Sequence, residues 1–142
     1  MGTPNSREFR ILNRLSDLDL LADGLREFCL AGGMSEEVFG DVRLAVEEAV
    51  SNTIRHGYAD AESHPILVRA DLDAGELRLE IEDDARAFDP LQAPLPDVRV
   101  PIEEKPRGGL GILLLRSVMD RLEYRRVGGK NILRLARSLG RK

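Results

Sequence analysis

The 142-residue sequence is poor in aromatic residues and contains a single cysteine. It has no tryptophan, two tyrosines and four phenylalanines, so leucine, valine, isoleucine and alanine must fill its core. A lone cysteine, Cys29, excludes an intramolecular disulfide and a CxxC-type metal site, and we expect a reducing, cytoplasmic compartment. Because apolar and small residues surround Cys29, we predict a buried structural thiol rather than a reactive one.

Long apolar runs and an excess of positive charge are also missing. No stretch approaches the roughly 18 uninterrupted apolar residues of a membrane-spanning helix, so we expect no membrane span. The formal net charge is −4. Proteins that bind DNA or RNA usually present a basic face that displaces counterions, so the composition argues against direct nucleic-acid binding. We expect the locally basic residues 121–142 to form a solvated face of a hairpin.

The length, composition and apolar periodicity of the sequence indicate a single domain that contains both helices and strands. A length of 142 residues, with 42% apolar and 32% charged residues, is typical of a single globular unit, which we place at residues 1–142. Each of the first two helices is expected to begin at a capping serine, Ser16 or Ser35. Apolar periodicity predicts, in chain order, a strand at 9–15, helices at 16–32 and 35–57, strands at 66–73 and 76–83, a helix that opens at 108–111, and strands at 122–127 and 132–137. Helices and hairpins in blocks favour an α+β fold, a two-layer α/β sandwich with a mostly antiparallel sheet and helices on one face.

Three stretches carry groups suited to ligand binding. The first is VEEAVSNTIRHGY, residues 46–58, in which Glu48 and Asn52 lie one helical turn apart beside the apolar stripe. A carboxylate can polarise a hydroxyl group, and an amide oxygen can coordinate a hard cation such as Mg²⁺. The same spacing also fits the solvated edge of an amphipathic helix.

The other two stretches flank a long proline-rich loop. EIEDDARAFDP, residues 80–90, places Asp83 at the end of a predicted strand, where it could accept a hydrogen bond from a ring amino group or simply end the strand in a turn. RGGLGILLLR, residues 107–116, has three glycines at the start of a predicted helix. The N-terminus of this helix could bind phosphate, or the glycines could simply form a flexible loop exit before an ordinary helix start. Residues 84–109 between them hold five of the seven prolines, and a loop of that length is usually functional or disordered. Together the three stretches supply the parts of a nucleotide site.

These motifs resemble those of the GHKL ATP-binding superfamily. LAVEEAVSNTIRHGY resembles its N box, and DDARAFDP and RGGLGILLLRSVMDRLEYRR resemble its first and second glycine boxes. The residues that follow the two glycine boxes are closest to the anti-sigma-factor serine/threonine kinase branch. The resemblance covers nearly the whole chain and implies a Bergerat-type ATP-binding fold with a flexible ATP lid at about residues 84–109.

The resemblance also implies roles for individual residues. Glu48 would be the general base for an attacking hydroxyl group, Asn52 would bind Mg²⁺, and Asp83 would accept a hydrogen bond from the adenine amino group. The residues that would approach the phosphates of ATP are Arg107, Gly108, Gly109 and Gly111. For Arg107, a solvated position on the lid is an equal alternative.

The first glycine box departs from the pattern of the family. It usually reads Asp-x-Gly-x-Gly, but alanine stands at both glycine positions here, as Ala85 and Ala87. Glycine permits a positive φ and a close backbone approach, whereas alanine adds a methyl group and restricts the turn. We therefore expect an altered site rather than an abolished one, with Ala85 the more serious change.

The function implied by the resemblance is that of a regulatory kinase. Such a protein binds ATP and Mg²⁺, holds a sigma factor inactive, phosphorylates a STAS-type anti-sigma-factor antagonist, and commonly forms a homodimer. One alternative is a non-catalytic module that sequesters a partner, which Ala85 favours and Glu48 and Asn52 oppose. A second alternative is the ATP-binding domain of a sensor histidine kinase, which the sequence opposes because neither His56 nor His64 lies in a separate dimerisation helix.

Overall fold

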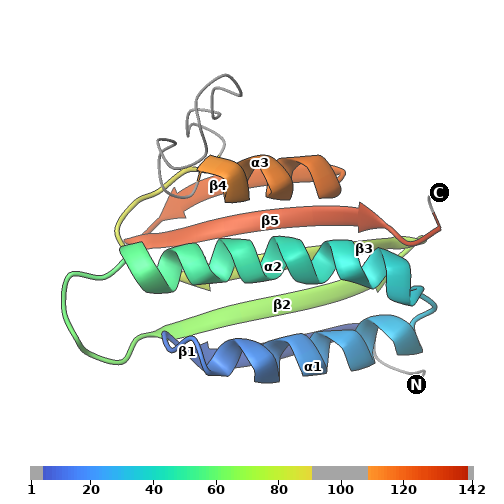
Figure 1. The fold of residues 1–142 in the computed structure, drawn as a ribbon, viewed down its shortest axis with the longest axis horizontal. Coiled ribbons are helices and arrows are strands. Elements are labelled where there is room, and N and C mark those ends of the chain that lie inside the picture. Colours follow the sequence, from blue (N-terminus) through green and yellow to red (C-terminus); the bar gives the residue numbers. More distant parts are fainter. Residues whose placement is uncertain (1–4, 91–108, 141–142) are drawn as a thin grey trace.

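The computed structural model describes residues 5–90 and 109–140, without the side chains of residues 109–112. Its elements in chain order are β1 (Ser6–Leu12), α1 (Asp17–Ala31), α2 (Glu36–His56), β2 (Pro65–Asp73), β3 (Glu76–Asp83), α3 (Gly109–Val118), β4 (Arg121–Val127) and β5 (Lys130–Ser138) (Figure 1). Both long helices, both hairpins and the third helix lie where the sequence predicted them.

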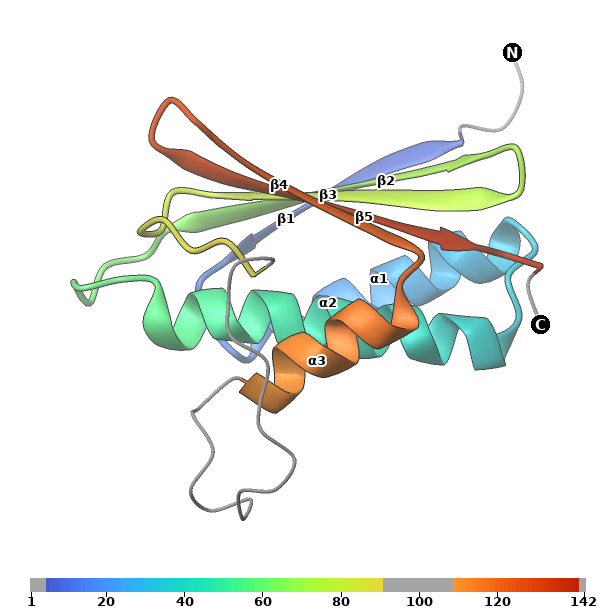
Figure 2. The same ribbon diagram turned by 90° about the horizontal axis from the view of Figure 1, so that it is seen from above.

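The strands form one antiparallel sheet in the order β1-β2-β3-β5-β4. All three helices cover the same face of this sheet, and the opposite face is open (Figure 2). This arrangement confirms the predicted two-layer α+β fold. Because β5 pairs with both β3 and β4, the start of β5 lies beside the end of β3.

The two hairpins turn at residues with positive φ. Ala74 and Gly75 join β2 to β3 at φ values of 54° and 74°, and Gly128 and Gly129 join β4 to β5 at 57° and 77°. Two consecutive positive φ values are the hallmark of the type I′ turn, whose twist matches that of paired strands. The second turn sets the register of β4 with β5, in which Arg126 stands opposite Asn131. The pairing of β5 with β3 places Asn131 opposite Asp83.

The core lies between the sheet and the helices, and aliphatic side chains dominate it. Leu25, Val50, Ile66 and Leu79 are among the side chains that are at most 1% exposed. Cys29 is also fully buried, and burial raises its pKa to about 12, which confirms the predicted structural thiol. Among the described residues, no helix is long and apolar enough to cross a membrane.

Two local predictions at the N-terminus are wrong. The first strand spans residues 6–12 rather than 9–15, because β2 begins at Pro65 and the ladder therefore ends at the Leu12–Pro65 pair. Ser16 makes no side-chain cap bond to α1. Asp17 instead accepts a hydrogen bond from the Leu12 backbone N–H at 2.9 Å, which ties the start of α1 to the end of β1.

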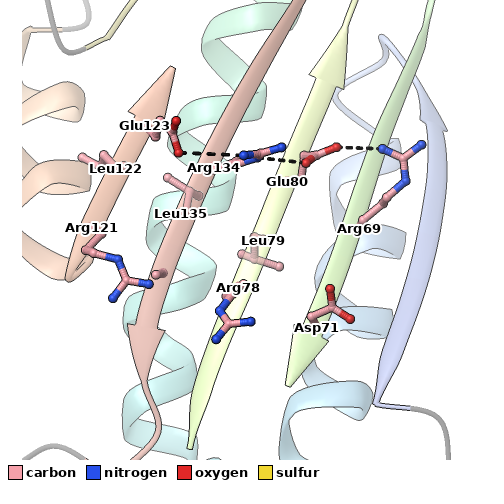
Figure 3. A pocket seen from close by; sticks show the side chains of 11 residues that line it. Arg69, Asp71, Arg78, Leu79, Glu80, Arg121, Leu122, Glu123, Arg134 and Leu135 are labelled. Atoms are coloured by element: carbon pink, nitrogen blue, oxygen red, sulfur yellow. Dashed lines mark hydrogen bonds and ion pairs between the residues drawn. The ribbon is translucent and has the colours of Figure 1, made fainter. Parts of the chain in front are cut away.

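Charged side chains cross the open face of the sheet in an alternating row. One residue from each strand contributes, in the order Glu8, Arg69, Glu80, Arg134 and Glu123. Figure 3 shows the last four of them. The successive ion pairs measure 3.1, 2.8, 3.1 and 3.9 Å. Exposed pairs of this kind contribute little to stability individually, but the row keeps this face polar.

A shallow hollow of about 370 Å³ lies beside this row of charges. Arg78, Arg121 and Ala136 are among its lining residues, and Ala136 stands opposite both arginines in the sheet. The hollow belongs to the open face (Figure 3), whereas the helix that carries Glu48 and Asn52 covers the other face. It is therefore separate from the predicted nucleotide site.

Candidate functional site

The C-terminal half of α2 carries the first two predicted site residues. Ser35 begins the helix by accepting a hydrogen bond from the Val38 backbone N–H at 3.1 Å, as predicted. Glu48 and Asn52 are both half-buried, one turn apart, beside the buried side chains of the helix. Within the described part of the chain neither side chain has a hydrogen-bond or ion-pair partner, so neither would have to break a structural contact to meet a ligand.

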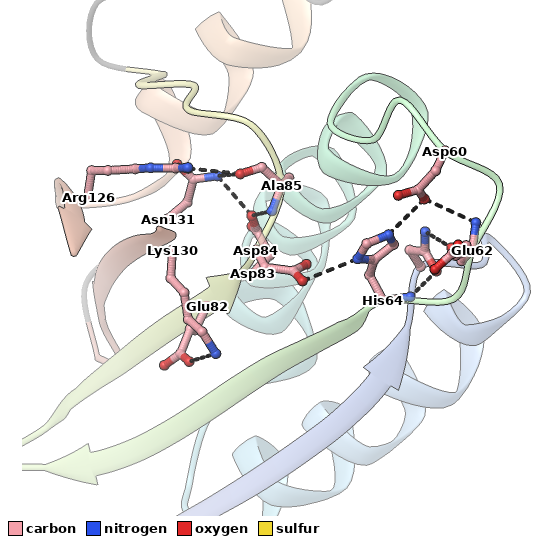
Figure 4. Close-up of polar contacts among 11 residues, drawn as sticks. Asp60, Glu62, His64, Glu82, Asp83, Asp84, Ala85, Arg126, Lys130 and Asn131 are labelled. Carbon is pink, nitrogen blue, oxygen red and sulfur yellow. Dashed lines mark hydrogen bonds and ion pairs between the residues drawn. The ribbon is translucent and has the colours of Figure 1, made fainter. Parts of the chain in front are cut away.

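Asp83 ends β3 as predicted, and its carboxylate is held in place by two short hydrogen bonds. The side chain lies on the inward face of the strand, and the residue is 5% exposed. Oδ1 accepts hydrogen bonds from the Ala85 backbone N–H at 3.0 Å and from Asn131 Nδ2 at 2.9 Å (Figure 4). Burial raises the pKa of Asp83, an effect that these hydrogen bonds partly offset.

Three residues of the second hairpin support this turn and were not identified from the sequence. Asn131 is 7% exposed, and its Oδ1 accepts hydrogen bonds from Arg126 Nη1 at 3.0 Å and from the Tyr124 hydroxyl. Arg126 Nη1 also donates to the Ala85 carbonyl oxygen at 2.8 Å. The available sequence signal was weak: Asn131 is a polar residue that starts an inward row continued by Leu133 and Leu135.

Ala85 packs against the end of α2 and does not need the backbone freedom of glycine. Ala74 is the residue other than glycine that has a positive φ among those described, so Ala85 adopts an ordinary backbone conformation. Its methyl group is buried and lies over Gly57, where an added Cβ would come within 2.6 Å of the Ala85 Cβ. The Arg86 backbone N–H donates to the Gly57 carbonyl oxygen at 2.9 Å. The turn after β3 is thereby attached to the helix that carries Asn52.

We expect the substitution Gly57→Ala to destabilise the protein by about 1–3 kcal/mol, because overpacking of a tight contact costs this much. A methyl group at this position would lie 2.6 Å from both the Ala85 Cβ and the Thr53 carbonyl oxygen. Urea denaturation measures the change in the free energy of unfolding. The matched control is Gly40→Ala in the same helix, where an added Cβ meets nothing within 4 Å. Since alanine favours helix more than glycine does, the control should gain about 0.5–1 kcal/mol; equal changes in both variants would contradict this packing argument.

The start of α3 contains two of the four residues predicted to approach the phosphates. Gly109 is the first residue of α3, and Gly111 lies in its first turn. Arg107 and Gly108, like most of the predicted lid, lie outside the described residues. The helix packs against α2, so its N-terminus belongs to the same layer as Glu48 and Asn52.

Asp83 and the Asn52 region meet through Thr53. The Thr53 hydroxyl lies 3.5 Å from Asp83 Oδ2, and Thr53 follows Asn52 directly in α2. The described residues contain no cluster of three or more acidic, histidine or cysteine ligands for a metal ion. Mg²⁺ bound with a nucleotide typically takes one or two protein oxygens and completes its shell with phosphates and water. A single asparagine amide oxygen, with no other partner, fits that chemistry.

A second polar cluster borders the site, in the loop between α2 and β2. His64 Nε2 lies 2.8 Å from Asp60, and its Nδ1 lies 3.2 Å from Asp84, the residue after Asp83 (Figure 4). The Tyr58 ring stacks on the imidazole with a centroid distance of 4.3 Å. Only an imidazolium can donate to both carboxylates at once, and the bonds to Asp60 and Asp84 raise the pKa of His64.

We therefore expect the contribution of His64 to the stability of the protein to decrease as the pH rises above about 6.5. A histidine whose pKa is raised by folding stabilises the native state fully below its unfolded pKa of about 6.5, and this contribution disappears as the pH rises through the higher folded value. NMR titration of the ring protons, with His56→Gln to assign the signals, measures the pKa of His64. The substitution Asp60→Asn should lower it, whereas Glu62→Gln, whose contacts in this loop are made by the backbone, should not. A His64 pKa at or below 6.5 would contradict the paired hydrogen bonds to Asp60 and Asp84.

The fold agrees with the class of protein that the sequence motifs implied. A five-stranded antiparallel sheet is covered on one face by the three described helices, as expected for the GHKL-type fold. A sequence profile described as the histidine kinase-like ATPase domain matches residues 11–137. The chain therefore belongs to the histidine kinase-like ATPase domain family.

Named relatives and solved structures agree with this family. The chain is 28% identical over 141 residues to the anti-sigma F factor of Thermoanaerobacter sp. (strain X514), covering 99% of this chain and 98% of that protein. It is 25% identical to the anti-sigma F factor of Caldanaerobacter subterraneus subsp. tengcongensis, covering 96% of each. A structure of the RsbU and RsbW domains of Rv1364c from Mycobacterium tuberculosis has a TM-score of 0.70 at 21% identity over 99% of this chain. The chain spans 34% of that longer structure, and this likeness is one of fold.

Proposed function

We propose that the protein is an anti-sigma regulatory factor with ATP-dependent serine/threonine kinase activity. It would bind ATP with Mg²⁺, hold a sigma factor inactive, and phosphorylate a STAS-type anti-sigma-factor antagonist. The full-length similarity to proteins named anti-sigma F factor supports the regulatory role. The family supports ATP as the nucleotide.

The observation that carries this proposal is the contact between α2 and the turn after β3. Through Thr53 and the C-cap residue Gly57, α2 touches both Asp83 and Arg86, so the amide proposed to hold Mg²⁺ and the carboxylate proposed to read the base are joined by direct contacts. Both long helices and strands β1, β2, β3 and β5 contribute buried residues to the core beneath these contacts, and β4 packs against it. Such support is what positions reacting groups for phosphoryl transfer, which depends mainly on positioning and charge neutralisation.

In the proposed reaction, the hydroxyl oxygen of the substrate serine or threonine attacks the terminal phosphorus of ATP. The new P–O bond forms as the bond to the leaving ADP breaks, and the proton of the hydroxyl group passes to the carboxylate of Glu48. Asn52 would hold Mg²⁺, which neutralises charge on the phosphates. Asp83 would accept a hydrogen bond from the adenine amino group and so orient the nucleotide.

Two measurements test the proposal. Calorimetry with ATP, in the presence and absence of Mg²⁺, should show binding that strengthens with the metal. Incubation with labelled ATP and a candidate antagonist should then transfer label to the antagonist. No heat at millimolar ATP would exclude the kinase and would favour the non-catalytic module. The buried, unstrained position of Ala85 beside Gly57 supports an intact turn after β3 and so favours the kinase over that module.

A further inference from the structure

Asn131 makes more side-chain hydrogen bonds around Asp83 than any other group described for this turn. Its Nδ2 donates to Asp83 Oδ1 at 2.9 Å and lies 3.3 and 3.0 Å from the carbonyl oxygens of Ala85 and Arg86. Its Oδ1 in turn accepts hydrogen bonds from Tyr124 and Arg126. Those two donors fix which end of the amide faces Asp83, since an amide oxygen there could not donate to the carboxylate.

The two oxygens of Asp83 are consequently unequal. Oδ1 already accepts two hydrogen bonds at 3.0 Å or less, from Ala85 and Asn131. Among the described residues, Oδ2 has a single hydrogen-bond contact, the Thr53 hydroxyl at 3.5 Å. That hydroxyl has one hydrogen, and the Ala49 carbonyl oxygen competes for it at 3.3 Å. Oδ2 is therefore the oxygen with unused capacity to accept a hydrogen bond.

We propose that Asn131 is a positioning residue for nucleotide selectivity: it engages Asp83 Oδ1 and so directs Oδ2 to the base. This inference rests on the proposed function. A carboxylate oxygen held in one direction can accept a hydrogen bond from the exocyclic amino group of adenine. In a 6-oxopurine such as hypoxanthine it would face a carbonyl oxygen, and two acceptors form no hydrogen bond. Asn131 would thus favour ATP over ITP without touching either nucleotide.

The role of Asn131 is tested by comparing the affinities of ATP and ITP. Calorimetry with Mg²⁺ gives both dissociation constants for the wild type, for Asn131→Ala and for Tyr124→Phe. Without the amide donor the Asp83 carboxylate can rotate, and we expect the preference for ATP to fall about tenfold, the value of one hydrogen bond to a charged group. Tyr124→Phe is the matched control, because it removes a contact to Asn131 but leaves the Asn131–Asp83 bond in place. It should retain the preference.

A measurement without nucleotide separates this inference from the proposed function. Removing the donor to Oδ1 should raise the pKa of Asp83 further, as seen by NMR of its carboxyl carbon in Asn131→Ala. If Asn131→Ala does not fold, Asn131→Leu, which is similar in size and also lacks the donor, replaces it in both measurements. An unchanged preference in a folded variant, or equal losses of ATP and ITP affinity, would overturn the role of Asn131 alone. A wild type that binds neither nucleotide would overturn the proposed function and the selectivity together.

Discussion

The substitution Glu48→Gln should lower the rate of phosphoryl transfer by about 10²–10⁴-fold, the range that a positioned general base contributes. Glutamine has the shape of glutamate but cannot take the proton from the attacking hydroxyl group. The Glu48 side chain has no structural partner in the described part of the chain, so its replacement should leave the free energy of unfolding nearly unchanged. The affinity for ATP should also stay within a few-fold. Single-turnover transfer of labelled phosphate to the antagonist, measured beside calorimetry, separates the two effects.

The adjacent residue provides the control for this experiment. Glu47 is also a glutamate of α2, but it forms a surface ion pair with Arg43 at 2.8 Å. Such an exposed pair contributes little to stability, so Glu47→Gln should leave both transfer and folding unaffected. Equal transfer rates for wild type and Glu48→Gln would remove Glu48 from the role of base. Equal losses in both variants would instead indicate a general effect of charge on this helix.

Much of the fold followed from the sequence because its signals are local. The period of the apolar residues determined the strand and helix types, and the Ala74–Gly75 and Gly128–Gly129 pairs marked the two hairpins. The limits of β1 were misplaced because they depend on pairing with β2, which begins at Pro65. Pairing between distant strands cannot be read from periodicity, since a shift of two residues keeps every side chain on the same face.

The same limit explains what was missed at the site. Asp83 stood out because it ends an apolar strand, but Asn131 lies 48 residues later and reaches Asp83 only through the register of β3 with β5. The local packing of Ala85 also could not be read from the motif alone. Its tolerance depends on Gly57, a residue from the end of another element whose missing side chain leaves room for the Ala85 methyl group.

The substitution Asp83→Asn should invert the preference between ATP and ITP. An amide oxygen at the Oδ1 position can still accept from Ala85 and Asn131, which requires the amide nitrogen to occupy the Oδ2 position. The group offered to the base then becomes a donor, which opposes the adenine amino group and suits the carbonyl oxygen of hypoxanthine. We expect ATP to bind about a hundredfold more weakly, because a hydrogen bond to a charged group is lost and two donors then face each other, and ITP to bind more tightly than in the wild type.

Folding should survive this change, so that calorimetry reports recognition of the base. Burial raises the pKa of Asp83, which means that its charged form opposes folding near neutral pH, and a neutral amide of the same size removes that cost. Asp84→Asn is the matched control: its carboxylate faces His64, and its replacement should leave the ratio of ATP to ITP affinity unchanged. An Asp83→Asn variant that folds and still prefers ATP as strongly as the wild type would show that the carboxylate does not read the base. The assignment of β3 and its turn as the nucleotide site would then be wrong, whatever the activity of Glu48.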